Sequence, residues 1–272
     1  MPFFFRQFSL AWTVAAVVLA AKPAAAVEPL AQAHAHNDYL HDRPLFDALD
    51  HGFTSVEADI FLVDGKLLVA HTKRELDPEK SLEKLYLNPL RERIKASGGS
   101  VYGDGKPFHL LIDLKSSGEP TYAALHATLA NYAEMLSCTK DGTYKSGAVS
   151  ISISGDRPIA VIKNQSERYA GIDGRISDLD SDDPADIMPL ISDSWFSHFK
   201  WLGSGEFKEA DRQKLRDYVN RAHAKGRKVR FWAAPDNPSA WSELQAAGVD
   251  LINTDNLAGL EAFLREQPAS SE

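Results

Sequence analysis

Short apolar runs alternate with longer amphipathic runs along most of the chain. The short runs either alternate apolar and polar residues or are rich in valine, isoleucine and aromatic residues, as β-strands are. They lie at residues 54–63, 66–71, 109–115, 148–154, 188–192, 228–233 and 249–254. The longer runs repeat apolar residues at helical spacing and predict helices at residues 43–52, 81–97, 119–136, 206–226, 238–248 and 256–267.

Glycines mark the ends of several predicted elements. Gly226 and Gly248 each follow an amphipathic run and are typical of helix C-termini. Asp64 and Gly65 separate two apolar runs and predict a two-residue β-hairpin turn. The strands at 54–63 and 66–71 are therefore expected to pair with each other.

The alternation of strands and helices predicts a parallel α/β fold in one domain. The chain has 272 residues, and (β/α)8 TIM barrels typically use about 250. A closed eight-stranded barrel fits this length best, and an open doubly wound sheet is the alternative. The glycine fingerprint GxGxxG of dinucleotide-binding sheets is absent from the sequence.

The first 26 residues have the layout of a secretory signal peptide. Arg6 precedes a short apolar stretch, and residues 24–26 are three alanines that form a small-residue cleavage site. A membrane anchor is the alternative, but the apolar stretch is shorter than the ~20 residues of a bilayer span. We predict a signal peptide at 1–26 and a barrel at 27–272, either periplasmic or secreted and without a membrane span after cleavage.

The net charge and the cysteine count bear on which binding partners and which kinds of site this chain could have. The chain has 30 Lys and Arg against 38 Asp and Glu, for a formal net charge of −8. A nucleic-acid binder needs clustered basic residues, so the acidic balance argues against this class. Cys138 is the only cysteine, which excludes a disulfide framework or a zinc–thiolate site within one chain.

Polar side chains gather near the ends of the predicted strands. They are His34, His36, Asn37, Glu57, Asp59, His71, Asp113 and Lys115. Residues i and i+2 of a strand point to the same face, so Glu57 projects with Asp59. Asp113 projects with Lys115 for the same reason. In a barrel all four would point inward near the carboxyl ends, where barrel active sites lie.

The electrostatics of this set predict a metal ion. Burying unpaired charge costs several kcal/mol, and Glu57, Asp59 and Asp113 would repel one another. Lys115 alone cannot balance three carboxylates, and a salt-bridge network is the alternative to a metal. A hard divalent cation with oxygen ligands, Mg²⁺ or Ca²⁺, solves the problem directly.

This residue set favours phosphodiester cleavage. A hard cation and a lysine would concentrate positive charge where phosphate oxygens sit, and two histidines could act as base and acid. Acyl transfer is disfavoured because the sequence has no G-x-S-x-G elbow. A glycosidase using Glu57 and Asp113 is a rival, but it would leave the histidines and the lysine without a role.

Four motifs carry a family resemblance. They are HNDY at 36–39, GFTSVEAD at 52–59, AHAKGRKVRFWAAPDN at 222–237 and AGVDLINTDNLAGL at 247–260. With them the chain resembles the phosphatidylinositol-phospholipase-C-like phosphodiesterases, which include glycerophosphodiester phosphodiesterases and sphingomyelinase-D-type toxins. It is most similar to the altered-inheritance-of-mitochondria protein 6 family, and the match extends over nearly the whole chain after residue 26.

The resemblance implies a role for each polar residue. His36 and His71 would be the acid–base pair, and Lys115 would contact the phosphate. The implied metal ligands are Glu57, Asp59 and Asp113, and the implied substrate-binding residues are Asn37, Lys115 and Trp232.

Two positions depart from the glycerophosphodiesterase pattern. Asn37 replaces the arginine usual after the first histidine, and Asp113 replaces a glutamate, as in the toxin branch. His34 competes with His36 for the first catalytic role. We prefer His36 because its 21-residue distance to Glu57 is close to the short spacing of the toxin branch.

Together these residues predict an exported, metal-dependent phosphoric diester hydrolase. Its substrate would be a glycerophosphodiester or a phospholipid-type or lysophospholipid-type molecule. We expect a monomer that acts on such a small molecule or on a phospholipid head group. A non-catalytic secreted binding protein on the same barrel is one alternative, since a fold alone does not give a function. A phosphodiesterase that forms a cyclic phosphate, by attack of a substrate hydroxyl, is the other.

Overall fold

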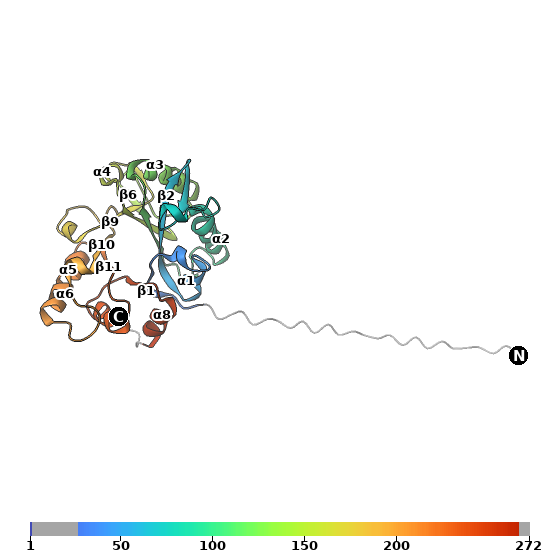
Figure 1. Cartoon of the computed structure of the whole chain (residues 1–272). Coiled ribbons are helices and arrows are strands. Elements are labelled where there is room, and N and C mark those ends of the chain that lie inside the picture. The colour runs from blue at the N-terminus through green and yellow to red at the C-terminus, as the bar shows by residue number, and fades with distance from the viewer. Residues whose placement is uncertain (2–26, 267–272) are drawn as a thin grey trace.

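The computed structural model describes Met1 and residues 27–266, and the predicted signal peptide therefore lies almost wholly outside the described residues. Eight parallel strands form a barrel, and helices surround it (Figure 1). The strands are β1 (Leu30–Ala35), β2 (Phe53–Val63), β4 (Phe108–Leu114), β7 (Val149–Gly155), β9 (Gly171–Gly174), β10 (Leu190–Ser194), β11 (Lys228–Trp232) and β12 (Ile252–Thr254).

The barrel closes in chain order. Each of these strands pairs in parallel with the next one along the chain as far as β11, and β12 pairs with β1. A single bridge between Arg230 and Leu251 joins β11 to β12. The predicted TIM barrel is confirmed, and the open doubly wound sheet is excluded.

An α-helix follows every barrel strand but β9, and two follow β10. The α-helices are α1 (Phe46–Asp50), α2 (Asn88–Ala96), α3 (Gly118–Leu129), α4 (Ile159–Lys163), α5 (Trp195–His198), α6 (Glu209–His223), α7 (Pro238–Ala246) and α8 (Leu257–Glu266). Shorter turns are η1 (Asp38–Leu40), η2 (Lys73–Glu75), η3 (Glu83–Leu87), η4 (Ala130–Tyr132) and η5 (Ile176–Asp178). Among the described residues, no helix combines the length and apolarity needed to cross a membrane.

Two local features lie outside the barrel. The antiparallel strand β3 (Lys66–Val69) pairs with β2 through the predicted hairpin, where Asp64 and Gly65 have φ of 48° and 77°. Positive φ at both positions is what a type I′ turn requires. A separate small sheet contains β5 (Cys138–Lys140), β6 (Thr143–Lys145) and β8 (Glu167–Arg168), and the sequence patterns did not predict it.

Each barrel strand separates an apolar outer layer from a largely polar interior. On β2, Val56, Ala58 and Ile60 belong to the hydrophobic core. The alternate residues Ser55, Glu57 and Asp59 are buried polar groups. Leu111, Leu190 and Leu251 form a separate apolar cluster. The main hydrophobic core therefore lies between the strands and the helices. The barrel interior can in turn hold the polar side chains of a functional site.

An aromatic cluster outside β11 offers a test of this layered core. Phe231 is 1% exposed, and its ring centroid is 5.8 Å from that of Trp195 and 5.9 Å from that of Phe199. We expect Phe231→Ala to lower the free energy of unfolding by about 3–5 kcal/mol, because it leaves a cavity. Chemical denaturation measures this change. Phe196→Ala is the matched control, since Phe196 is 50% exposed and its loss should cost within about 0.5 kcal/mol. Equal losses in both variants would contradict this placement of the core.

Candidate active site

The three predicted metal ligands meet near the middle of β2 and the carboxyl end of β4. These strands are hydrogen-bonded neighbours, and their register places Asp59 opposite Asp113. Glu57 lies two residues before Asp59 and shares its face of β2. One oxygen from each of the three carboxylates lies within 4.8 Å of the others. The structure thus brings together residues that are up to 56 positions apart (113 − 57).

Lys115 lies against two of the three carboxylates. Its Nζ is 2.9 Å from Oδ2 of Asp113 and 3.1 Å from Oδ2 of Asp59. Burial alone would lower the pKa of Lys115, but the two carboxylates raise it above its usual value. Lys115 is therefore a stable cation that occupies one oxygen of each aspartate.

The second oxygen of each aspartate has no such partner. Asp59 Oδ1 and Asp113 Oδ1 are buried and make no hydrogen bond to any described residue. Gly155 leaves space beside Asp113, because a Cβ at this position would collide with Oδ1. Buried, unpaired carboxylate oxygens are costly, and they are the ligands that Mg²⁺ and Ca²⁺ prefer. The residues present therefore fit a divalent metal.

Arg230 is a second buried cation, which the sequence analysis missed. Its Nη2 donates a hydrogen bond to Oε2 of Glu57, and its Nε donates to Oδ1 of Asn253 at 2.8 Å. Burial alone would raise the pKa of Glu57, but the guanidinium holds it below its usual range. Lys115 is thus not the only balancing cation. The case for a metal rests on the two unpaired aspartate oxygens rather than on a shortage of positive charge.

His36 lies at the rim of this cluster, directly after β1. Its Nδ1 is 2.8 Å from Oδ1 of Asp255, which follows β12. The side chain is 26% exposed, and its Nε2 makes no hydrogen bond to the residues at 27–266. A carboxylate at Nδ1 fixes the ring and stabilises the cation that forms when Nε2 takes a proton. His36 is therefore placed to exchange a proton with a ligand.

His71 also lies beside the cluster, with its Nδ1 toward a carboxylate. Its Nδ1 lies 3.2 Å from Oδ2 of Asp59 and 3.1 Å from the hydroxyl of Tyr39. The side chain is 50% exposed. Burial and the Glu57 carboxylate raise the pKa of Asp59 to about 6. His71 thus contacts one of the predicted metal ligands directly.

Tyr39 connects the two histidines, and it was quoted in the sequence motif without a role. Its hydroxyl is 2.6 Å from Oδ2 of Asp59 and 2.7 Å from Oδ1 of Asn37. Asn37 Nδ2 in turn lies 3.3 Å from Nδ1 of His36. Asn37 has φ of 46°, a left-handed conformation that asparagine adopts more readily than most residues. Asn37 thus shapes the rim of the site through its backbone and its amide.

His34 lies deeper in the barrel than His36. It is fully buried, and its Nδ1 is 2.7 Å from the hydroxyl of Ser55. Its Nε2 faces Oε2 of Glu57 at 3.6 Å. Burial, with Arg230 nearby, lowers the pKa of His34 to about 3, so the ring is neutral. His34 is thus buried beside Glu57, whereas His36 is partly exposed, which favours His36 for the acid–base role; the choice between them stays a prediction.

Trp232 is placed at the same end of the barrel. It is the last residue of β11 and is 39% exposed. It lies two residues after Arg230 and so shares the strand face that points inward. A role in substrate binding fits this position and stays a prediction.

A second polar cluster in the interior was also missed. Asp173 on β9 is fully buried and accepts hydrogen bonds from Ser154 at 2.8 Å and from Ser192 at 2.7 Å. Arg175 donates to the same carboxylate at 2.9 Å. The segment GIDG at 171–174 contains two glycines and little apolar pattern, so it did not read as a strand.

Comparison with known families agrees with this geometry. A model of the AIM6-like phosphodiesterase domain matches residues 23–173, more than half of the chain. The chain belongs to this family. Residues 228–258 also match the glycerophosphoryl diester phosphodiesterase family. The resemblance drawn from the sequence motifs is confirmed.

Individual members of the AIM6-like family match over most of their length. The altered inheritance of mitochondria protein 6 homolog of Arthroderma benhamiae is 27% identical over 262 residues, covering 85% of this chain and 82% of that protein. Altered inheritance of mitochondria protein 6 of Saccharomyces cerevisiae S288c is 28% identical over 270 residues, covering 82% of this chain and 68% of that protein.

Solved structures of phosphodiesterases share the barrel. A calcium-dependent phosphoinositol-specific phospholipase C from a Pseudomonas species has a TM-score of 0.55 at 12% identity, covering 87% of this chain and 93% of that one. A glycerophosphodiester phosphodiesterase from Agrobacterium tumefaciens C58 has a TM-score of 0.51 at 14% identity, covering 88% and 100%. This AIM6-like chain therefore has the fold of a phosphodiesterase barrel.

Asp38 in the HNDY motif has a structural role that can be tested by pH. Its Oδ2 accepts hydrogen bonds from the backbone N–H of Leu45 at 2.6 Å and from Tyr86 at 2.8 Å. Burial raises the pKa of Asp38 from 3.8 to about 7. A carboxyl whose pKa is raised on folding contributes stability below its unfolded pKa and loses that contribution as the pH rises through the folded value.

We therefore expect Asp38→Asn to gain stability relative to the parent between about pH 4 and pH 7, by up to a few kcal/mol. Denaturant unfolding at both pH values measures this difference. Asp42→Asn, an exposed neighbour, is the control and should show no comparable trend. A pH-independent difference between Asp38→Asn and the parent would show that Asp38 folds in its ionised form.

Proposed function

We propose that this protein is an exported, metal-dependent phosphodiesterase. The observation that carries the proposal is the pair of unpaired aspartate oxygens beside a charged lysine, with two partly exposed histidines nearby. Membership of the AIM6-like phosphodiesterase family supports the reaction class. The signal-peptide layout of residues 1–26 supports export to the periplasm or the medium.

Glu57, Asp59 and Asp113 would hold the metal, Mg²⁺ or Ca²⁺. When bound, the ion would supply a Lewis acid that stabilises negative charge on non-bridging phosphate oxygens. Lys115 already lies beside two of these carboxylates, so its ammonium would also lie close to the negative charge on the phosphate oxygens. Its role would be to bind the phosphate and to stabilise the transition state.

The two histidines would act as general base and general acid. Each turns Nδ1 toward a carboxylate, Asp255 for His36 and Asp59 for His71. One imidazole would deprotonate the nucleophile at its Nε2, and the other, as the cation, would protonate the leaving oxygen. Tyr39 and Asn37 would help to hold both rings in place. The Tyr39 hydroxyl contacts Asn37 Oδ1 and His71 Nδ1, and the Asn37 amide lies beside His36.

We propose a glycerophosphodiester or a phospholipid-type head group as the substrate, cleaved by a monomer without nucleic acid as a partner. Trp232 and Asn37, at the open end of the barrel, would contact the part of the substrate beyond the phosphate. The nucleophile is either water, which gives hydrolysis, or a substrate hydroxyl, which gives a cyclic phosphate. A non-catalytic binding protein is less well supported, since the described site has lost neither a histidine nor a carboxylate.

Chelation tests the reaction and the metal together. We expect phosphate-ester cleavage of a panel of glycerophosphodiesters, lysophospholipids and phosphoinositides to disappear in excess chelator and to return with Mg²⁺ or Ca²⁺. Metal at a hundredfold excess over its Kd should also stabilise the fold by about 2.7 kcal/mol. Product analysis by ³¹P NMR distinguishes a phosphomonoester from a cyclic phosphate.

The outcomes of the chelation experiment separate the alternatives. Full turnover in chelator would contradict the metal site and leave Lys115 as the phosphate ligand. Metal-dependent stabilisation without turnover of any substrate would favour a binding protein. As a control, Glu243→Gln should respond to metal as the parent does, because Glu243 pairs with Arg212 outside the site.

A second experiment distinguishes the histidines. General acid–base groups typically contribute about 10²–10⁴-fold, so His36→Ala and His71→Ala should each lose about this much in kcat. His34→Gln should keep most of the turnover and instead lower the stability, because the neutral ring is buried against Ser55. Steady-state kinetics and denaturation measure both effects. An inactive His34→Gln beside an active His36→Ala would reverse the assignment.

A further inference from the structure

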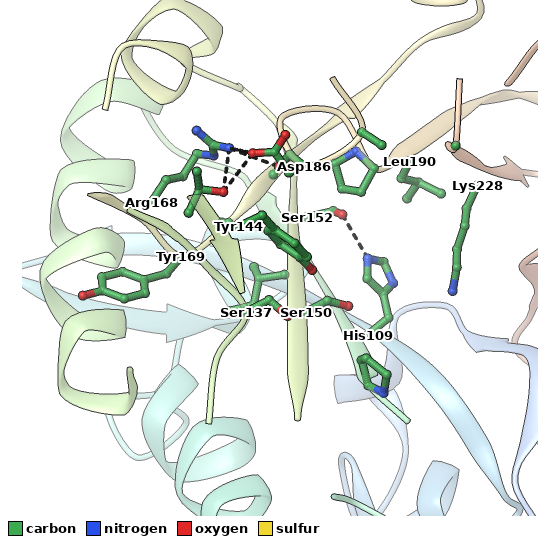
Figure 2. Close-up of a pocket in the computed structure, with 18 residues that line it drawn as sticks. His109, Ser137, Tyr144, Ser150, Ser152, Arg168, Tyr169, Asp186, Leu190 and Lys228 are labelled. Atoms are coloured by element: carbon green, nitrogen blue, oxygen red, sulfur yellow. Dashed lines mark hydrogen bonds and ion pairs between the residues drawn. The ribbon is translucent and has the colours of Figure 1, made fainter. Parts of the chain in front are cut away.

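A cavity of about 390 Å³ lies at the end of the barrel opposite to the carboxylates (Figure 2). The first residues of several barrel strands form one wall, including His109 of β4, Leu190 of β10 and Lys228 of β11. The small sheet of β5, β6 and β8 contributes the other wall through Thr139, Tyr144 and Arg168. Small-molecule sites typically measure about 300–1,000 Å³, so the space is large enough for a ligand.

The cavity exists because small residues occupy this end of the barrel. Gly171 and the serines Ser150 and Ser152 line it. The interior of a TIM barrel is normally filled there by bulky branched side chains, which these residues do not supply. His109 cannot swing into the space, because Ser55 and Ser152 hold its two ring nitrogens at 2.9 Å and 3.0 Å.

Lys228 gives the cavity a net positive charge. Arg168 is neutralised, since its Nη2 is 2.7 Å from Oδ2 of Asp186. Figure 2 shows this pair joined by dashed lines, whereas Lys228 on the other side has none. Within residues 27–266, the Nζ of Lys228 has no ion pair or hydrogen-bond partner. One free ammonium fits one negative charge better than a phosphate dianion.

Much of the rest of the lining is apolar, although Ser137 also lines the cavity. Ile151, Tyr169 and Pro189 form part of the wall. Tyr144 of β6 lies over the cavity in Figure 2 and is 51% exposed, which is unusual for so large a ring. Apolar walls with a few placed polar groups are typical of sites for small organic molecules.

We propose that this cavity is a second ligand site, which binds a small amphipathic carboxylate with its head on Lys228 and its apolar body against Ile151 and Tyr144. The serine hydroxyls of Ser150 and Ser152 would give the head further hydrogen bonds. This site is distinct from the phosphodiesterase site and does not depend on its activity.

Calorimetric titration of the full-length mature protein with octanoate tests the proposal. We expect saturable binding at one site, while octan-1-ol, which lacks the charge, and acetate, which lacks the apolar body, should each bind about tenfold or more weakly. Lys228→Met should weaken octanoate binding by about tenfold to a hundredfold, because it removes a charge-assisted hydrogen bond. Tyr144→Ala should weaken it through lost apolar contact without disturbing the fold, since this side chain is exposed.

Two controls locate the binding. Lys66→Met removes an exposed lysine at the start of β3 and should bind octanoate as the parent does. Lys115→Met, at the other end of the barrel, should also retain binding whether or not it retains phosphodiesterase activity. The proposal is overturned if octanoate gives no saturable heat at millimolar concentration, if Lys228→Met and Tyr144→Ala both bind normally, or if Lys115→Met alone abolishes binding.

Discussion

Repulsion among Glu57, Asp59 and Asp113 is the constraint on which the carboxyl end of this barrel depends. Three carboxylates within 4.8 Å of one another, mostly buried, require nearby positive charge. The chain supplies Lys115, directly after β4, and Arg230 of β11, and both contact the carboxylates directly. These contacts still leave two aspartate oxygens unpaired. Unpaired carboxylate oxygens are expected where the side chains serve as ligands of a metal cation.

The position of the hydrophobic core makes this cluster possible. The core lies mainly outside the strands, where aromatic and branched residues pack between sheet and helices. The interior can then hold polar side chains whose hydrogen bonds are satisfied across neighbouring strands. A chain of such bonds runs from Ser152 through His109 and Ser55 to His34, which faces Glu57. Hydrogen-bonded side chains in the barrel interior thus extend as far as the histidine that faces Glu57.

Much of the fold and part of the candidate active site could be predicted from the local sequence pattern. The hairpin at Asp64 and the strands at 54–63 and 109–115 follow from hydrophobic spacing and turn chemistry, and the structure has them at nearly these bounds. Period-two spacing also put Glu57 with Asp59 on one strand face. Asp173 escaped notice because GIDG is too short and too rich in glycine to read as a strand. Its serine partners come from two other strands, which no local pattern connects.

The sequence by itself determined the strand–helix alternation, the family motifs and the residue types of a phosphodiesterase site. These properties depend on neighbours within a few positions, where side-chain periodicity acts. Only the tertiary structure decided that Arg230 pairs with Glu57, 173 residues away, and that His34 is buried while His36 reaches the surface. The reason is physical: barrel closure sets which strands face each other, and burial and ion pairing then decide the protonation state and the accessibility of each group.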